Sequence, residues 1–165
     1  MRRAASCLAL LLPVAPLQAE DCAAPLAAAE VHRAAALEAT RDRRPVRRAY
    51  PDCPPLGATV TEWRDARGRL RRALLESGSE DSAFAAETFF DIEGRARVGI
   101  VTGGAVSGAR LLQRIAIAPD GHRLCEARRV SAPGYTFPHP WPEELLPRAA
   151  ARDGRCPWPE ESERP

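Results

Sequence analysis

A turn that recurs three times at nearly equal spacing is the feature that most constrains the fold. Gly68, Gly94 and Gly121 each end a short polar turn, and they lie 26 and 27 residues apart. A type I turn whose last residue is a glycine in the left-handed conformation joins two antiparallel strands tightly. The repeat therefore predicts three hairpins in series, linked by longer connections, which together form an antiparallel meander.

Alternation of apolar and polar residues around these turns predicts six strands. We expect them at Ala58–Arg64, Arg69–Glu76, Ala83–Phe90, Arg95–Thr102, Arg110–Ala118 and Arg123–Val130. One face should collect the apolar side chains Leu70, Leu74, Phe84, Phe90, Val98, Ile100, Ile115 and Ile117, and the other Arg71, Glu87, Arg97 and Arg114. A sheet with one apolar face needs a covering layer.

Two flanking segments could supply that layer. Pro25–Arg44 is rich in Ala, Leu, Glu and Arg and predicts one helix, with a thin apolar stripe at Leu26, Ala27, Val31, Ala34 and Leu37. Arg41–Leu56 overlaps the end of this helix and is interpreted as an extended connector. Residues 131–156, rich in proline and aromatic residues, predict a strap packed on the sheet, because proline is excluded from central strands.

The fold class predicted is therefore α+β, with an Ala-rich helix, a six-stranded meander and a C-terminal strap. The chain divides into an N-terminal segment (1–19), a helix and connector (20–57), the sheet (58–130) and the strap (131–156). The acidic end at 157–165 is expected to be disordered.

Residues 1–19 resemble a secretory signal peptide. Arg2 and Arg3 precede a short apolar run, and the segment ends at Ala19, a small residue suited to cleavage. The run is too short to span a membrane, so no stable membrane insertion is expected, and the protein should be periplasmic or secreted. Cleavage would leave 22 arginines against 22 acidic residues, since the chain has no lysine. Net charge therefore gives no support to a nucleic-acid partner.

Four cysteines remain after cleavage, namely Cys22, Cys53, Cys125 and Cys156. An even count in an oxidising compartment favours two structural disulfides. Thiol redox chemistry and metal binding are weaker alternatives because no pair of cysteines is separated by two residues. Three pairings are possible; loops of about thirty residues favour Cys22 with Cys53 and Cys125 with Cys156.

A functional site is expected at the end of the sheet that carries the longer loops, because loops on a rigid scaffold often carry function. The candidate ligand-binding residues there are Glu80, Asp81, Thr102, Gly103, Gly104, Tyr135, His139 and Trp141. Thr102–Gly108 could bind an anion through backbone N–H groups, although it lacks the ending of a phosphate-binding loop and also fits a flexible hairpin. Glu80 and Asp81 could act as an acid/base pair or as calcium ligands, or simply be solvated.

No set of residues forms a recognisable catalytic constellation or a cofactor or metal motif. His32 and His122 lack the spacing of zinc ligands. The leading hypothesis is an exported, non-catalytic binding domain whose partner is a protein or another envelope ligand. The alternatives are a small hydrolase using Glu80, Asp81 and His139, and an envelope inhibitor or structural protein.

Two resemblances concern the turns and the loops. Phe89–Arg95 resembles the hairpin motif of Rhs-type tyrosine-aspartate repeat proteins, in which an aromatic residue and an aspartate precede a glycine turn. Ser77–Ala83, Val101–Arg110 and Gly134–Pro142 resemble segments of a group of exported proteins from GC-rich bacteria. The second resemblance implies export and implies no particular activity.

Overall fold

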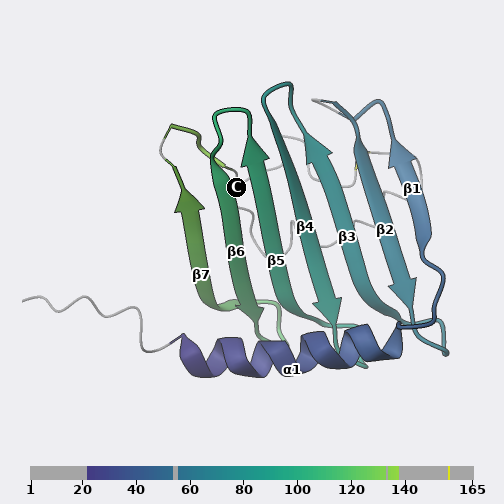
Figure 1. Cartoon of the computed structure of the whole chain (residues 1–165). Coiled ribbons are helices and arrows are strands. Elements are labelled where there is room, and N and C mark those ends of the chain that lie inside the picture. Colours follow the sequence, from purple (N-terminus) through teal and green to yellow (C-terminus); the bar gives the residue numbers. More distant parts are fainter. Residues whose placement is uncertain (1–21, 54–55, 133, 138–155, 157–165) are drawn as a thin grey trace, which may run out of the picture.

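The computed structural model describes residues 22–53, 56–132, 134–137 and 156. Seven strands form one antiparallel sheet in chain order, and one helix lies across it (Figure 1). The elements are α1 (Ala23–Ala39), β1 (Val46–Tyr50), β2 (Ala58–Arg64), β3 (Leu70–Gly78), β4 (Ser82–Phe90), β5 (Ala96–Ala105), β6 (Arg110–Ile117) and β7 (Arg123–Ser131). The predicted α+β class and meander are confirmed, with seven strands in place of six.

The three predicted glycine turns join β2 to β3, β4 to β5 and β6 to β7 at one end of the sheet. Gly68, Gly94 and Gly121 have φ angles of 75°, 81° and 94°. Their amides donate to the first residue of each turn at 3.0 to 3.1 Å. The strand register shifts beside each turn, as a glycine bulge requires. The turn chemistry predicted from the sequence is therefore confirmed.

The seventh strand is β1, which the sequence prediction placed in the extended connector. Its residues pair with β2, from Val46 opposite Glu62 to Tyr50 opposite Ala58. Pro45 precedes this strand and Pro51 follows it, as suits the short edge strand of an open sheet. Neighbouring arginines at 47 and 48 hide its alternation, so the prediction missed it.

Apolar side chains lie on both faces of the sheet, so the prediction of one apolar face was wrong. Cross-strand pairing places Phe84, Phe90, Ile115 and Ile117 on one face, and Leu74, Val98 and Ile100 on the other. We call the face that carries α1 the helix face. The other, which Tyr135 and Phe137 contact, is the strap face. The bulges beside the glycine turns shift the alternation, and a simple period of two does not follow that shift.

Helix α1 packs on β3 to β7 at the end of the sheet that carries the glycine turns (Figure 1). Ala29 and Ala36 are buried against Phe89, Val98 and Ala116, so the backbone of the helix approaches the sheet closely. The predicted helical stripe was only partly correct. Leu26 and Leu37 join this contact, but Val31 is 69% exposed on the opposite side of the helix.

The helix ends at Ala39, earlier than the predicted Arg44. The Thr40 hydroxyl donates to the Ala36 carbonyl at 2.8 Å, and the Thr40 amide donates to the Leu37 carbonyl at 3.2 Å. Such local bonds close the last turn and satisfy carbonyls that the helix would leave free. The arginines that follow belong to the connection to β1.

Two disulfides connect segments far apart in the chain. Cys22 pairs with Cys125, and Cys53 pairs with Cys156, each across 103 residues. The favoured pairing of sequence neighbours was therefore wrong. The first bond fastens the beginning of α1 to β7, and the second fastens the β1–β2 connection to the C-terminal segment. Both fit an oxidising, extracytoplasmic environment.

In the described part of the chain, no helix is long and apolar enough to cross a membrane. The predicted signal peptide (1–19) and acidic tail (157–165) lie outside the described residues. For the strap, the described residues are Ser131, Ala132, Gly134 to Phe137, and Cys156. Phe137 is buried against the strap face, so this part of the predicted packing is confirmed.

Candidate binding surface

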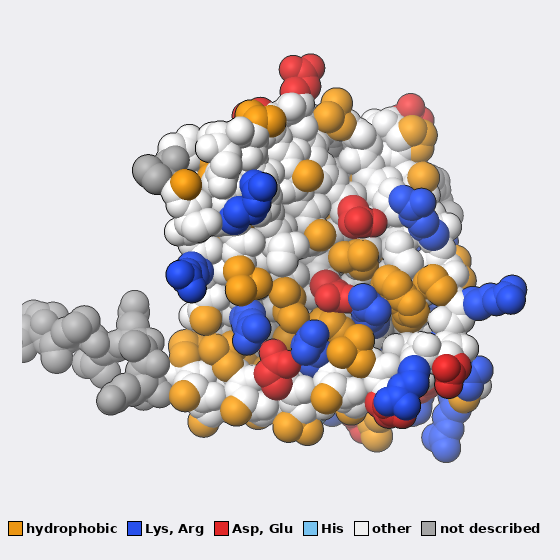
Figure 2. All heavy atoms as spheres, in the orientation of Figure 1, with side chains coloured by type: hydrophobic (Ala, Val, Ile, Leu, Met, Phe, Trp, Pro, Cys, Tyr) orange, Lys and Arg blue, Asp and Glu red, His pale blue; other side chains and the backbone are white. Residues whose placement is uncertain are grey.

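Half of the helix face is not covered by α1. This half, which we call the open half-face, lies toward the β1–β2, β3–β4 and β5–β6 connections (Figure 1). Cross-strand pairing places small side chains there, together with isolated charges. Its members are Ala49, Thr59, Glu76, Ala83, Ala85, Thr102, Gly104, Arg110 and Leu112. Figure 2 shows this half largely free of bulky side chains, above the more crowded half that carries the helix.

Two shallow hollows cross the open half-face. One of about 370 Å³ is lined by Ala85, Thr102, Gly104 and Arg110, together with Glu76, Ser77 and Ala83. A second, of about 480 Å³, includes Ala49, Leu56 and Thr59, and shares Glu76, Ser77 and Ala83 with the first. Because they share these residues, the two shallow hollows adjoin each other across the strands from β1 to β6, and we call them together the groove.

The groove has an acidic residue near its middle and one basic residue, Arg110, at its β6 end, and a second basic residue lies beyond that end on β7. Glu76 is exposed and makes no ion pair with any described residue. Arg110 lies over Gly104, and its guanidinium Nη1 donates to the Ala109 carbonyl at 3.1 Å. Arg129 is exposed on β7, opposite Leu112. The floor between these charges is formed by alanine, glycine and threonine, which can approach a partner closely.

Three of the predicted site residues, Thr102, Gly103 and Gly104, line this groove. Gly103 lines it through its backbone, because a Cβ atom added there would lie on the strap face, 2.8 Å from the Phe137 ring. All three residues are paired within β5, which continues to Ala105. The predicted loop is therefore shorter than residues 102–108, because residues 102 to 104 continue the strand and only the following turn forms the hairpin connection. Ligand binding by Thr102, Gly103 and Gly104 stays a prediction.

The β5–β6 connection is another tight turn. The Ala105 amide donates to the Ala109 carbonyl at 3.0 Å, and Gly108 has a φ angle of 88°. This geometry matches that of the glycine turns at the opposite end. The sequence offered Gly108 as a signal, but the neighbouring glycines at 103 and 104 obscured where the strand ends.

Glu80 and Asp81 are exposed in the β3–β4 connection. Asp81 accepts a hydrogen bond from Ser79, and its carbonyl accepts one from the Val106 amide at 2.9 Å. Tyr135 is hydrogen-bonded through its hydroxyl to Ser82. The structure thus brings the two connections and the strap to one end of the sheet, as expected. His139 and Trp141 lie outside the described residues, so binding by the predicted set stays a prediction.

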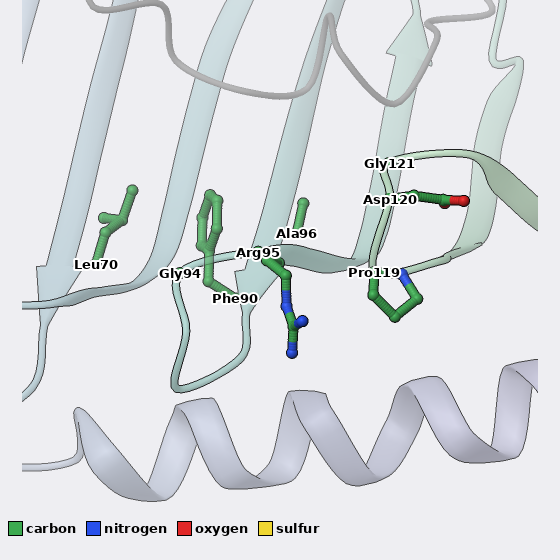
Figure 3. Close-up of a pocket in the computed structure, with 8 residues that line it drawn as sticks. All are labelled: Leu70, Phe90, Gly94, Arg95, Ala96, Pro119, Asp120 and Gly121. Carbon is green, nitrogen blue, oxygen red and sulfur yellow. The ribbon is translucent and has the colours of Figure 1, made fainter.

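A third hollow, of about 380 Å³, lies between glycine turns at the other end of the sheet (Figure 3). Leu70, Phe90 and Ala96 line it, beside Arg95 and Asp120. In Figure 3 Arg95 points toward α1 and Asp120 points away from Phe90. Arg95 is also held by Asp91 at 2.9 Å. Since its charged groups do not converge, this hollow is a weaker candidate than the groove.

The perturbed carboxylates of the described residues belong to the scaffold. Burial opposes ionisation of Asp65, but hydrogen bonds from Arg69 and Arg67 outweigh it and hold the Asp65 pKa at about 2. The pKa of Asp91 is lowered in the same way by Arg95 and Glu93. Burial also opposes ionisation of Glu62, yet Arg64 and Arg48 lower its pKa. Within the part of the chain that the structure describes, no cluster of His, Cys, Asp and Glu could hold a metal ion.

Sequence reasoning missed most of the groove, including Glu76, Ala83 and Ala85. These residues are unremarkable in the sequence, and strand register alone brings them together. Comparison of the chain with protein-family models, with curated proteins and with solved structures finds no match.

Proposed function

We propose that the protein is an exported, non-catalytic binding domain that holds a helical segment of a protein partner in the groove. One observation carries the proposal: α1 covers one half of the helix face, while the other half has a groove with a floor of small residues. Helices and sheets pack as layers, and a sheet face left half covered can accept a second element beside the first.

The residue types in the groove define what would fit. Small side chains at Ala83, Ala85 and Gly104 permit close approach of a helix through its own small residues. Glu76 would favour a basic side chain near the centre of the segment, and Arg110 would favour an acidic one toward one end. The two disulfides support export, and the resemblance to exported proteins from GC-rich bacteria remains part of this proposal.

Selection from a displayed library of helical peptides tests the proposal. Peptides enriched on the protein should lose binding to Thr102→Arg, because the new side chain fills the groove. They should keep binding to Ser107→Arg, which adds the same charge to the nearby exposed turn. Failure to enrich any peptide, or peptides that bind Thr102→Arg as well as they bind the unmodified protein, would remove the groove as a binding surface.

A further inference from the structure

The outer edge of β7 is a second surface to which another element could be added. Among the described residues, no strand pairs with this edge, which lies at one side of the sheet (Figure 1). About half of the N–H and C=O groups of an antiparallel edge strand point outward and are available to a further strand. Five consecutive residues of β7, Ala127–Ser131, are exposed. This edge can therefore accept a further strand.

The edge at the other side of the sheet is less suited to pairing. There β1 has only five residues, and Pro45 and Pro51, which have no N–H group, flank it. In contrast, β7 has nine residues and contains no proline. It is also held in place, because a disulfide fastens it to the start of α1 and Arg128 donates to the Phe137 carbonyl at 3.1 Å. An edge strand that is already ordered loses little conformational entropy when it pairs.

The bulge in β7 presents an apolar side chain at this edge. Arg71 and Arg97 are the extra residues of the corresponding bulges in β3 and β5. Each reaches the following strand and donates there to a carbonyl, that of Phe90 or of Ile117, at 3.2 Å. Leu124 is the extra residue in β7, has no following strand among the described residues, and is 57% exposed. A leucine thus stands where the other two bulges have an arginine, and it should contact a strand added at this edge.

We infer that β7 pairs antiparallel with β7 of a second copy of this chain, around a two-fold axis perpendicular to the joined sheet. Residues opposite each other in an antiparallel pair face the same side, so the axis places one residue directly opposite its own counterpart. Ala127 is the middle residue of Arg123–Ser131, and only an axis at Ala127 pairs all nine residues of the strand. Both copies then use the same surface, as two-fold symmetry requires.

The charges of β7 favour the same register. An axis at Ala127 places Glu126 opposite Arg128 of the second copy on the strap face, and the symmetry repeats this pair. An axis at Glu126 or at Arg128 would instead place like charges directly opposite each other. Glu126 also forms an ion pair with Arg123 of its own strand, so the dimer gives this carboxylate arginines on two sides.

The exposed apolar side chains of β7 meet in this register as well. Leu124 comes to lie beside Val130 of the second copy, and Val130 is 44% exposed in the single chain. Only one strand of each copy takes part, so the interface is at the lower end of the size range for specific association, and we expect a weak dimer. The groove of each copy stays uncovered, so the dimer does not depend on the proposed function.

Sedimentation equilibrium of the purified, disulfide-bonded protein tests the dimer. Between about 10 μM and about 1 mM, the average mass should rise from that of one chain toward that of two. Arg128→Glu should weaken the association by about tenfold, because it places two carboxylates opposite each other in both halves of the interface. Arg129→Glu makes the same change at the next residue, which faces the other side of the sheet, and should alter the affinity by less than about threefold.

Disulfide crosslinking tests the register. In Ala127→Cys the new thiols lie opposite each other across the axis, with Cα atoms within about 5.5 Å, a distance that a disulfide can span. In Arg129→Cys, the control, they are four residues apart along the strands, roughly 14 Å. Mild oxidation should give a covalent dimer from the first variant, which peptide mapping shows to be linked through position 127 of both chains, and little from the second.

Three results would overturn the inference. The first is an unmodified protein that stays monomeric at the highest concentration. The second is an equal effect of Arg128→Glu and Arg129→Glu on the affinity, and the third is equal crosslinking of Ala127→Cys and Arg129→Cys. Peptide selection on the groove has its own outcome in each case, because β7 takes no part in lining the groove.

Discussion

At the scale of single residues, two of the glycine turns are stabilised by the same set of hydrogen bonds to an aspartate carboxylate. In the first, Asp65 accepts hydrogen bonds from the backbone of Arg67 and Arg69 and from the Arg69 side chain, at 2.9 to 3.1 Å. In the second, Asp91 accepts the corresponding three bonds from Glu93 and Arg95 at 2.9 to 3.0 Å. The third turn starts with Ala118, and among the described residues the Asp120 carboxylate accepts a hydrogen bond only from the His122 amide, at 3.2 Å.

Asp65→Ala and Asp91→Ala should therefore each lower the free energy of unfolding by about 2 kcal/mol, since charged hydrogen bonds are lost from a nearly buried carboxylate. Asp120→Ala serves as the matched control and should cost less than about 0.5 kcal/mol, because its carboxylate is exposed. Urea denaturation of the three variants measures these differences. Equal losses of unfolding free energy in all three variants would contradict the proposed role of the Asp65 and Asp91 hydrogen bonds.

The lowered pKa of Asp65 also predicts a dependence of stability on pH. Its pKa is about 2 in the folded protein and close to 3.9 in an unfolded chain. The unfolded state therefore binds the proton first as the pH falls, so the contribution of Asp65 is complete above about pH 5 and is lost toward pH 2. Denaturation midpoints between pH 5 and 2 should fall less steeply in Asp65→Ala than in the unmodified protein; parallel curves would refute the assignment.

At the scale of elements, the turns were predictable because their geometry needs only local residues. Gly68, Gly94 and Gly121 carry that information, and so the meander followed from the sequence. The faces of the strands did not follow from the sequence, because Arg71, Arg97 and Leu124 are the extra residues of bulges and shift the alternation of β3, β5 and β7. The end of β5 was also missed, since glycines at 103 and 104 suggest a loop unless the contact of Phe137 with Gly103 is known.

That contact gives a prediction with a matched control in the same strand. Gly103→Ala should destabilise the protein by about 1 to 3 kcal/mol, because its new methyl group meets the ring of Phe137 at 2.8 Å and Leu111 at 3.3 Å. The nearest atoms to the new methyl group of Gly104→Ala are side-chain atoms of Arg110, from 3.1 Å, and this long side chain can shift, so stability should change by less than about 0.5 kcal/mol. Thermal denaturation compares the two variants, and equal losses would show that Phe137 does not pack closely on β5.

At the scale of the whole molecule, the disulfides join elements that sequence spacing cannot relate. Cys22 and Cys125 have Cα atoms 5.5 Å apart, and those of Cys53 and Cys156 are 5.4 Å apart. The sequence predicted that these cysteines pair, but their partners depend on how α1 and the C-terminal segment return to the sheet. The preference for short disulfide-closed loops led to the wrong pairing, because loop length does not indicate where α1 and the C-terminal segment lie against the sheet.

Mass spectrometry of peptides from the unreduced protein should find Cys22 linked to Cys125, and Cys53 linked to Cys156. Replacing the cysteines of either pair together with serine should cost about 4 to 5 kcal/mol, because each bond closes a loop of roughly 100 residues. Peptides that link Cys22 to Cys53 would show that α1 is not fastened to β7.

The central claim, that the open half-face is a protein-binding surface, is tested most directly by photo-crosslinking in the producing cell. A photoreactive amino acid is placed at Thr102 in the groove, or at Ser107 in the exposed turn as the control. Illumination should give a discrete protein adduct from position 102 and none from position 107. Its mass distinguishes a second copy of the chain from another protein. No adduct at position 102, or the same adducts from both positions, would contradict the account.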